Sequence, residues 1–409
     1  MSDLTYGFDP YLPLPKEDRK GIALCFSGGG YRAALFHLGA VRRLDELGVL
    51  SKVDTITSVS GGSIFAAQIA GHVARHRDAW REPGSPVDGF EEGIAAPTRR
   101  LATEDIRTSA VFARLKPWKW FDQNAQIDTL SARLAKGPAG VKLGDLPPRP
   151  RFVFCATDVC FRAQWTFDTG TKAVGEEPAG HAPLGDWTVA RAAAASSCLP
   201  VAFAPMRVHE RLTGGAYEGA DRADLIAAID LTDGGIYDNL GLEPVWRDHA
   251  VVLVSDAAPA FKPEPHIGRL WSQLRYVVTL LEQSTDVRKR WLIASFKRGD
   301  LDGTFWGIGS KPSNYGFDPG VPVYSDELVG GFISQTRIDL DPFSEGEQAV
   351  LQNHGYLMAE LAVQKHAPQL ATGRPAPQAP FPDWMDESRV RRALAESHKT
   401  KAFARRWKR

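Results

Sequence analysis

The chain has few cysteines, no excess of charge of either sign and no long uncharged hydrophobic run. Neither the number nor the spacing of its four cysteines suggests a disulfide framework or a zinc site. They lie mostly in apolar stretches, so we expect buried thiols in a reducing compartment. These cysteines are Cys25, Cys155, Cys160 and Cys198.

Charge and hydropathy also limit the classes of partner. Lys plus Arg equals Asp plus Glu at 49 each, so no global field favours nucleic acid or an anionic membrane. No apolar run approaches the ~18 residues that a membrane span needs. Residues 1–20 contain no apolar signal core. We therefore expect a soluble cytoplasmic protein without a nucleic-acid partner.

One large domain accounts for most of the chain. Residues 21–366 contain no linker and are predicted to form one elaborated domain, although domains are commonly ~50–250 residues long. A Pro-rich polar arm (1–20) precedes it, and a Pro-rich and basic tail (367–409) follows. Within the domain, 81–150 differ in composition and are predicted to form a cap-like insertion.

The domain opens with a strand, a glycine turn, a helix and a second strand. The apolar run at 21–27 leads to the turn GGGYR at 28–32, residues 33–50 have helical spacing, and Val53 to Val59 alternate as a strand does. Such a unit implies a parallel sheet with a right-handed crossover. The run AVVLVSDAA at 250–258 is typical of a buried parallel strand. The sequence therefore predicts an α/β fold.

The second strand turns at once into a helix through Ser60-Gly61-Gly62-Ser63. A serine at such an elbow is lifted out of the sheet and lies at the positive end of the following helix. Ser60 is therefore the candidate nucleophile. Serine and glycine also form many purely structural turns, so the assignment depends on the residues around it.

The glycine run Gly28-Gly29-Gly30 follows a strand and opens a helix. Its backbone N–H groups can converge on an anion without a Cβ in the way, which beside an activated serine makes an oxyanion hole. Gly28-x-Gly30-x-x-Ala33 also matches a dinucleotide fingerprint, which requires an acid at the end of the second strand. That place is occupied by Ser60, and Asp54 lies at the strand's beginning, so the cofactor interpretation fails.

The turn Asp233-Gly234-Gly235 follows an apolar run. An acid at a strand end before two glycines can reach a neighbouring strand end, and within hydrogen-bond reach of Ser60 it acts as a general base without histidine. The alternative is an ordinary turn. His249 or His266 would follow the α/β-hydrolase order, but neither lies in a glycine-flanked loop at a strand end, which disfavours a triad.

Arg32 follows the glycine run directly. Its guanidinium can hold a phosphate with two hydrogen bonds near the oxyanion site. A surface salt bridge is an equal alternative at this point.

The order GGGYR, SVSGG and DGG resembles that of the patatin-like phospholipases and of the catalytic domain of the cytosolic phospholipase A family. The resemblance extends over about 21–366 and includes CATDV with a later WTFDTG, AAAASSCLPVAF and DGGIYDNLGLEP. It implies a three-layer α/β/α sandwich around a mainly parallel sheet, with a serine nucleophile whose only partner is an aspartate. On this chain the roles map onto Ser60 as nucleophile, Asp233 as base, Gly28, Gly29 and Gly30 as oxyanion hole, and Arg32 as the cation that stabilises phosphate or oxyanion.

Two positions depart from the family pattern. Ser58 stands where a glycine usually precedes the nucleophile by two residues, and Ala33 stands where a glycine often closes the first motif. Both replacements are small, although a Cβ at position 58 tightens the turn.

The predicted function is therefore a serine acyl hydrolase that cleaves carboxylic esters of lipids or phospholipids through an acyl-enzyme. It needs no metal or other cofactor, and the sequence contains no calcium-loop pattern. The alternatives are a catalytically silent lipid- or nucleotide-binding protein on the same fold, and an esterase with a Ser-His-Asp triad. KPWKWFDQN (116–124) and the basic tail have the composition of a peripheral membrane contact, but cap packing explains these aromatics equally well.

Overall fold

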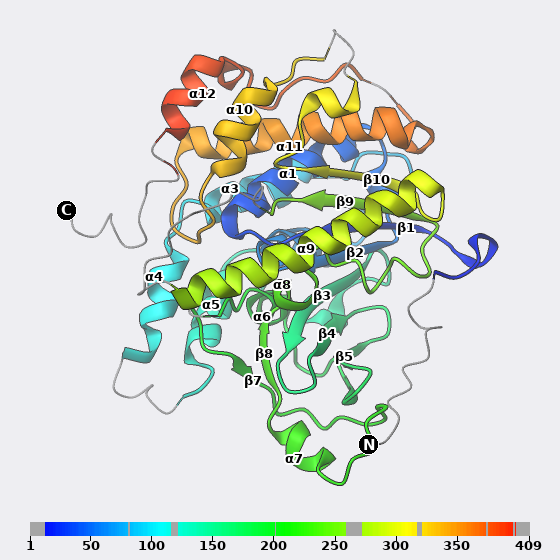
Figure 1. Ribbon diagram of the computed structural model, residues 1–409, viewed down its shortest axis with the longest axis vertical. Helices are drawn as coiled ribbons and strands as arrows, with labels where there is room; N and C mark the ends of the chain where they lie inside the picture. Colours follow the sequence, from blue (N-terminus) through cyan, green and yellow to red (C-terminus); the bar gives the residue numbers. More distant parts are fainter. Residues whose placement is uncertain are drawn as a thin grey trace.

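A ten-stranded mixed sheet lies between two layers of helices (Figure 1). The strand order is β10-β9-β1-β2-β3-β4-β5-β6, and β8 pairs with both β3 and β7. The computed structural model describes residues 13–80, 82–115, 122–200, 202–258, 272–316, 321–373, 375–395 and 397.

The half of the sheet from β10 to β3 is parallel. Its strands, in spatial order, are β10 (Asp302–Gly307), β9 (Val251–Asp256), β1 (Ile22–Phe26), β2 (Thr55–Val59) and β3 (Arg151–Asp158). The register pairs Phe26 with Ser58 and Val59 with Cys155. All carboxyl ends of these strands therefore meet at one edge, where α/β proteins place their sites.

The other half of the sheet is antiparallel, which the sequence analysis did not predict. It contains β4 (Ala163–Asp168), β5 (Ala173–Glu176), β6 (Gly180–Pro183), β7 (Met206–Arg207) and β8 (Asp230–Asp233). In β8, Asp233 pairs with Ala156 of β3. The predicted three-layer α/β/α architecture is confirmed, with β3 as the strand at which the sheet changes direction.

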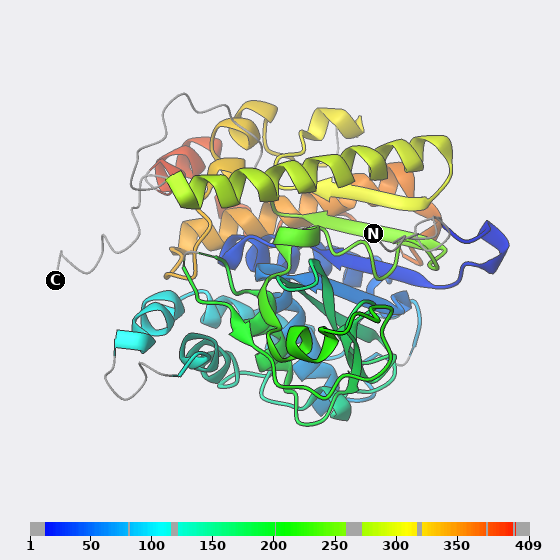
Figure 2. The same cartoon turned by 60° about the horizontal axis from the view of Figure 1, so that its bottom comes forward.

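Alternate residues of β1 define the two layers. Leu24 and Phe26 belong to the core formed with α1 (Gly30–Glu46), α2 (Gly61–Arg75), α6 (Val189–Ser196) and α11 (Glu345–His366). Ala23 and Cys25 belong to a smaller core that includes Leu292 of α9 (Ser272–Arg298). Figure 2 shows α9 (yellow-green) crossing in front of the strands and α11 (orange) beyond them.

Helices α1 and α11 approach each other unusually closely because glycines lie at their contact. A Cβ at Gly39 would come within 1.9 Å of the Gln352 carbonyl oxygen, and one at Gly355 within 2.0 Å of the Phe36 carbonyl oxygen. The chain enters α11 through a capping box in which Ser344 and Glu347 satisfy each other's backbone N–H groups. This close pair of helices belongs to the layer that packs against Leu24 and Phe26 of β1.

The remaining helices surround this framework. Helices of the predicted insertion contact α2 and α6, and α12 packs on α11. The domain boundaries remain predictions, and residues 116–121 and 398–409, in which the predicted membrane-contact segments largely fall, lie outside the described residues. These helices are α3 (Ala96–Leu101), α4 (Ile106–Val111), α5 (Ala125–Leu134), α7 (Arg222–Ala227), α8 (Gly235–Asp238), α10 (Asp326–Gly331) and α12 (Glu387–Leu394).

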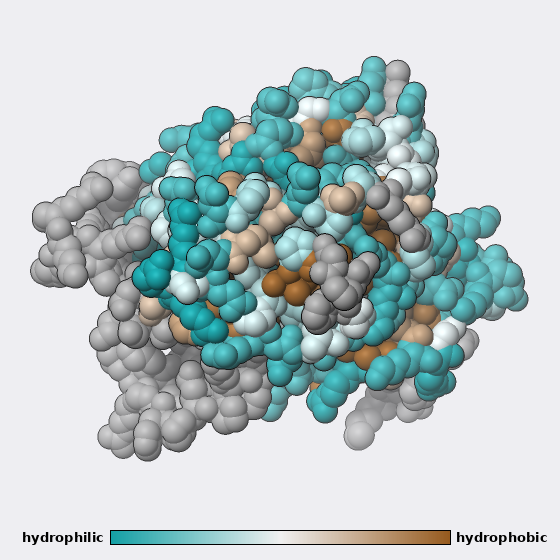
Figure 3. Space-filling view, turned by 90° about the horizontal axis from the view of Figure 1, so that it is seen from above, coloured by the Kyte–Doolittle hydropathy of each residue, from teal (hydrophilic) through white to brown (hydrophobic). Residues whose placement is uncertain are grey.

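The surface and the thiols agree with the composition. The face at the top of Figure 1 is largely hydrophilic, with hydrophobic residues in small separate groups (Figure 3). Among the described residues, no helix combines the length and hydropathy needed to cross a bilayer. All four cysteines are free; Cys160 is half-buried, and the other three are buried as predicted.

Candidate active site

Ser60 lies at the sharp turn between the last residue of β2 and the first residue of α2. Its backbone has φ 51° and ψ −121°, a conformation that residues other than glycine rarely adopt and that is often found at functional sites. The predicted elbow is therefore present. It projects the serine at the carboxyl edge of the parallel strands, next to the amino end of α2.

The glycine loop after β1 touches this elbow. A Cβ at Gly61 would lie only 2.2 Å from the Gly30 carbonyl oxygen, and a Cβ at Gly28 would lie 3.0 Å from the Cβ of Ser60. Gly29 and Gly30 have φ values of 143° and 60°, which side chains disfavour. Glycines at these positions therefore allow the loop and the elbow to come into contact.

The backbone donors of the loop are not equivalent. The Gly28 N–H donates to Asn239, with 3.2 Å to the side-chain Oδ1 and 3.3 Å to the main-chain oxygen. Within the described part of the chain, the N–H groups of Gly29, Gly30 and Gly61 have no hydrogen-bond acceptor. Asn239 belongs to the DGGIYDN stretch, but sequence reasoning gave it no role.

Asp233 ends β8 beside Ser60. Its side chain is buried, and its Oδ1 accepts a 2.8 Å hydrogen bond from the Gly235 N–H. The Ser60 side chain lies close enough to the carboxylate to lower its pKa. Burial raises the pKa of Asp233 to about 6, although the Ser60 side chain and the Gly235 hydrogen bond act in the opposite direction. The structure thus brings the two predicted side chains together and makes the carboxylate a stronger base than an exposed aspartate.

A buried set of serine hydroxyls supports the elbow from below. Ser196 Oγ accepts the Ser60 N–H at 2.9 Å and donates to the Cys155 carbonyl at 2.6 Å. Ser63 Oγ is hydrogen-bonded to Ser196 Oγ at 2.8 Å and to Ser58 Oγ at 3.0 Å. The unusual Ser58 therefore joins a polar network instead of crowding the turn. Sequence reasoning gave Ser63 and Ser196 no role. The signal that could have identified them is a serine at a buried helix end, in the first turn of α2 and at the last residue of α6.

Replacement of Ser196 by alanine should reduce the stability of the fold. It leaves the Ser60 N–H and the Cys155 carbonyl without their buried partner, so we expect the free energy of unfolding to fall by about 1–3 kcal/mol. Urea denaturation measures this loss. Ser197→Ala is the matched control, because Ser197 Oγ only donates to Ala193 of its own helix at 2.8 Å. Equal losses in both variants would contradict a specific role for Ser196.

Arg32 is buried beneath the glycine loop and is not a surface residue. Its Nη1 donates to the Thr336 carbonyl at 2.9 Å and its Nη2 to the Ala257 carbonyl at 2.5 Å. Among the described residues its Nε has no partner. Desolvation lowers the pKa of Arg32 to about 10, so it remains charged at neutral pH. The guanidinium joins three separate segments, and contact with a substrate phosphate remains a prediction.

The histidines of the alternative triad lie elsewhere. His249 Nε2 is 2.8 Å from Thr55 Oγ1, at the start of β2 and roughly 13 Å from the strand end that leads to Ser60. Both ring nitrogens of His37 are occupied, by Ser255 Oγ and the Ser27 carbonyl. Burial lowers its pKa to about 4, so the ring is neutral. His266 lies outside the described residues.

The acid that the dinucleotide interpretation would need is also at the wrong edge of the sheet. Asp54 Oδ2 accepts the Ile22 N–H at 2.9 Å, and Asp54 forms an ion pair with Arg149 at 3.0 Å. Both partners adjoin the beginnings of parallel strands. No group of three or more His, Cys, Asp or Glu side chains in the described ranges is arranged to hold a metal ion.

A sequence profile described as patatin-like phospholipase matches residues 24–246, more than half of the 409 residues. The chain belongs to the patatin-like phospholipase family. As a patatin-like phospholipase it is a lipid acyl hydrolase, which confirms the predicted enzyme class and disfavours the silent binding protein. The match includes the glycine loop, the Ser60 elbow and the Asp233 turn.

Comparisons with individual proteins give only distant similarities. VipD from Legionella pneumophila is 16% identical, with 87% of this chain and 68% of that chain covered and a TM-score of 0.37. Human GIVD cytosolic phospholipase A2 is 11% identical, with 95% of this chain and 64% of that chain covered and a TM-score of 0.40. No curated protein sequence matches this patatin-like chain significantly.

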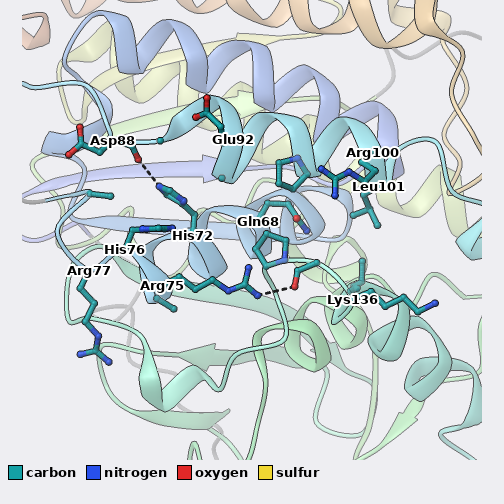
Figure 4. Close-up of a pocket in the computed structure, with 18 of the residues that line it drawn as sticks. Gln68, His72, Arg75, His76, Arg77, Asp88, Glu92, Arg100, Leu101 and Lys136 are labelled. Carbon is teal, nitrogen blue, oxygen red and sulfur yellow. Dashed lines mark hydrogen bonds between the residues drawn. The ribbon is translucent and has the colours of Figure 1, made fainter.

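A cavity of about 1120 Å³ lies on the outer side of α2 and does not include Ser60 or Asp233 (Figure 4). It begins at Gln68, about 12 Å along the helix from Ser60. In it, His72 Nε2 is 2.7 Å from the Asp88 carbonyl oxygen, and Arg75 donates to the Gly137 carbonyl. The lining carries acidic and basic groups together, so its charge selects no ligand.

Proposed function

We propose that the protein hydrolyses carboxylic esters of phospholipids with Ser60 as nucleophile and Asp233 as its only base. The observation that carries this proposal is the placement of the buried Asp233 carboxylate beside the Ser60 side chain, close enough for the serine to lower the pKa of the carboxylate. The pair lies beside backbone N–H groups that have no acceptor within the described residues. These groups lie at the carboxyl edge of the sheet and are the nucleophile, the base and the electrophilic donors of the proposed reaction.

The reaction takes two steps. Asp233 accepts the hydroxyl proton as Ser60 Oγ attacks the ester carbon, and the collapse of the tetrahedral intermediate breaks the bond to the alcohol oxygen. That oxygen leaves with the proton from Asp233, and the acyl group remains on Ser60. Water then loses a proton to Asp233 and attacks the acyl-enzyme, which releases the fatty acid and restores the serine.

The developing negative charge is stabilised by the glycine loop. The N–H groups of Gly29, Gly30 and Gly61 are available to the oxyanion and lie at the amino ends of α1 and α2. Gly28, also predicted for this role, donates its N–H to Asn239 and contributes chiefly by allowing close approach to Ser60. Arg32 adds a positive charge beneath Gly29 and holds the loop in place.

Covalent capture tests this assignment. An alkyl fluorophosphonate should inactivate the enzyme with one adduct on the peptide that contains Ser60, and fatty-acid release from phosphatidylcholine should fall in proportion to the fraction labelled. Peptide mass spectrometry and a fatty-acid assay follow both quantities. Full activity with Ser60 completely modified, or inactivation that follows a different residue, would overturn the proposal.

A further inference from the structure

The glycine loop rests on a segment that is distant in the chain. Residues 336–341, here called the strap, lie between α10 and α11 and belong to no helix or strand. A Cβ at Gly30 would lie 2.6 Å from the Asp339 carbonyl oxygen and 3.1 Å from the Asp339 nitrogen. The Tyr31 N–H donates to the same carbonyl oxygen at 2.9 Å. The strap therefore contacts the Gly30–Tyr31 peptide directly.

This contact orients a peptide group of the loop. Tyr31 is the second residue of α1, and the first N–H groups of a helix have no acceptor within the helix. The Asp339 carbonyl supplies one. A trans peptide group is planar, so the Gly30 carbonyl points away from the Tyr31 N–H, and it lies against the start of α2, where a Cβ at Gly61 would come within 2.2 Å of it. The strap thus restricts the backbone at Gly30, whose own N–H is a proposed oxyanion donor.

Two arginines hold Asp339 in this position. Arg107 Nη1 forms an ion pair with Asp339 Oδ2, and Arg107 Nη2 lies 3.6 Å from Asp341 Oδ2. Arg337 Nη1 also lies 3.6 Å from Asp339 Oδ2. The side chains of Arg107 and Asp339 are only 11% and 10% exposed, so solvent ions screen their attraction weakly. The ion pair therefore fixes a segment that has no regular secondary structure of its own.

Arg107 belongs to the predicted insertion and not to the strap. It is the second residue of α4, where the N–H groups of Ile106 and Arg107 donate to the Leu340 carbonyl at 3.1 and 3.2 Å. The Phe343 N–H also donates to the Ala102 carbonyl at 2.8 Å. These backbone contacts do not involve the Arg107 side chain, so α4 should stay docked on the strap when that side chain is replaced.

We propose that Arg107 and Asp339 are positioning residues for the glycine loop. Their ion pair holds the Asp339 carbonyl against the Tyr31 N–H and so links the start of α4 to the proposed oxyanion donors. The inference rests on the proposed function, because it concerns the donors that the reaction would use. Neither side chain needs to touch the substrate for this role.

Steady-state hydrolysis of a water-soluble ester tests the positioning role. Arg107→Gln should lower kcat by roughly 10- to 100-fold with little change in KM, because displaced donors affect the transition state more than the bound ester. An alkyl trifluoromethyl ketone forms a tetrahedral oxyanion when Ser60 Oγ adds to its carbonyl carbon, and its inhibition constant should rise by the same factor. Arg107→Lys restores the charge and should recover part of kcat.

A second variant tests the ion pair itself. Asp339→Asn keeps the backbone carbonyl and removes the charge that Arg107 binds, so it should lower kcat as Arg107→Gln does. The double variant Arg107→Gln with Asp339→Asn should be no slower than Arg107→Gln alone, because the two side chains act as one unit. Losses that add in the double variant would overturn the proposal.

Arg151→Gln is the matched control. Arg151 donates two hydrogen bonds to Asp168, at 2.8 and 2.7 Å, in a part-buried ion pair at the start of β3. It therefore lies at the opposite edge of the parallel strands from Ser60. Its replacement removes a comparable ion pair, and kcat and the inhibition constant should stay unchanged. Thermal unfolding verifies that each variant is folded. Equal losses of kcat in Arg107→Gln and Arg151→Gln would contradict the positioning role.

Hydrogen exchange separates this inference from the proposed function. The peptide that covers 28–32 should lose protection in Arg107→Gln and keep it in Arg151→Gln, whether or not the protein hydrolyses esters. If that occurs but wild type shows no hydrolysis and no fluorophosphonate adduct at Ser60, the Ser60 mechanism fails while the link from α4 to the loop stands. If hydrolysis depends on Ser60 but Arg107→Gln keeps wild-type kcat, the positioning role fails alone, with or without faster exchange.

Discussion

Ser60→Ala is expected to lower kcat/KM for ester hydrolysis by at least about 10³-fold, because it removes the hydroxyl that we propose as the nucleophile of the acyl-enzyme. The Ser60 side chain lies beside Asp233, and its N–H is held independently by Ser196. Alanine keeps that backbone bond, so the elbow and the thermal stability should change little. The measurement is steady-state hydrolysis of a fluorogenic short-chain ester, with residual activity checked for contaminating esterase.

Ser197→Ala provides the control for this loss. Ser197 is a buried serine that adjoins the network residue Ser196 but donates only within its own helix. Its removal should leave kcat/KM unchanged. If Ser60→Ala retained activity comparable with that of Ser197→Ala, the nucleophile would lie elsewhere and the strained backbone at position 60 would be a purely structural turn.

The two residues that we propose as nucleophile and base each have a local signal in the sequence. Ser60 lies between an alternating strand and a helix, and Asp233 precedes two glycines at a strand end. Their partnership is not local. In the structure, Val59 pairs with Cys155 and Asp233 pairs with the next residue of β3, Ala156. The central strand β3 therefore aligns the two turns, although 173 positions separate Ser60 from Asp233 in the chain.

Features that depend on convergence of distant segments escaped prediction. The sequence places Arg32 at the start of a helix whether it binds phosphate or forms a surface salt bridge. Its burial depends on distant segments, because its guanidinium donates to the carbonyls of residues 257 and 336, which approach it only when the chain folds. Ser196 similarly ends an alanine-rich helix, and only the approach of α6 to β3 reveals that it supports the elbow. The antiparallel strands were invisible for a related reason, because an apolar run does not encode strand direction.

Asp233→Asn should lower kcat/KM by roughly 10²–10⁴-fold, the usual contribution of a positioned general base. The pH profile provides a sharper test. Because burial raises the pKa of Asp233 to about 6, wild-type kcat/KM should be constant above that value. It should then fall about tenfold per pH unit below it, as the carboxylate becomes protonated. The asparagine variant cannot titrate there, so its residual activity should lack this acidic limb.

The matched control for this change is Asp230→Asn, at the start of the same strand. Asp230 forms an ion pair with Arg207 at 2.6 Å and is distant from the elbow in register, so its loss should leave both rate and pH profile intact. The double variant Ser60→Ala with Asp233→Asn should be no slower than Ser60→Ala alone, since a base has no function without the hydroxyl it deprotonates. Additive losses would show that Asp233 contributes through the fold, because a true dyad fails as one unit.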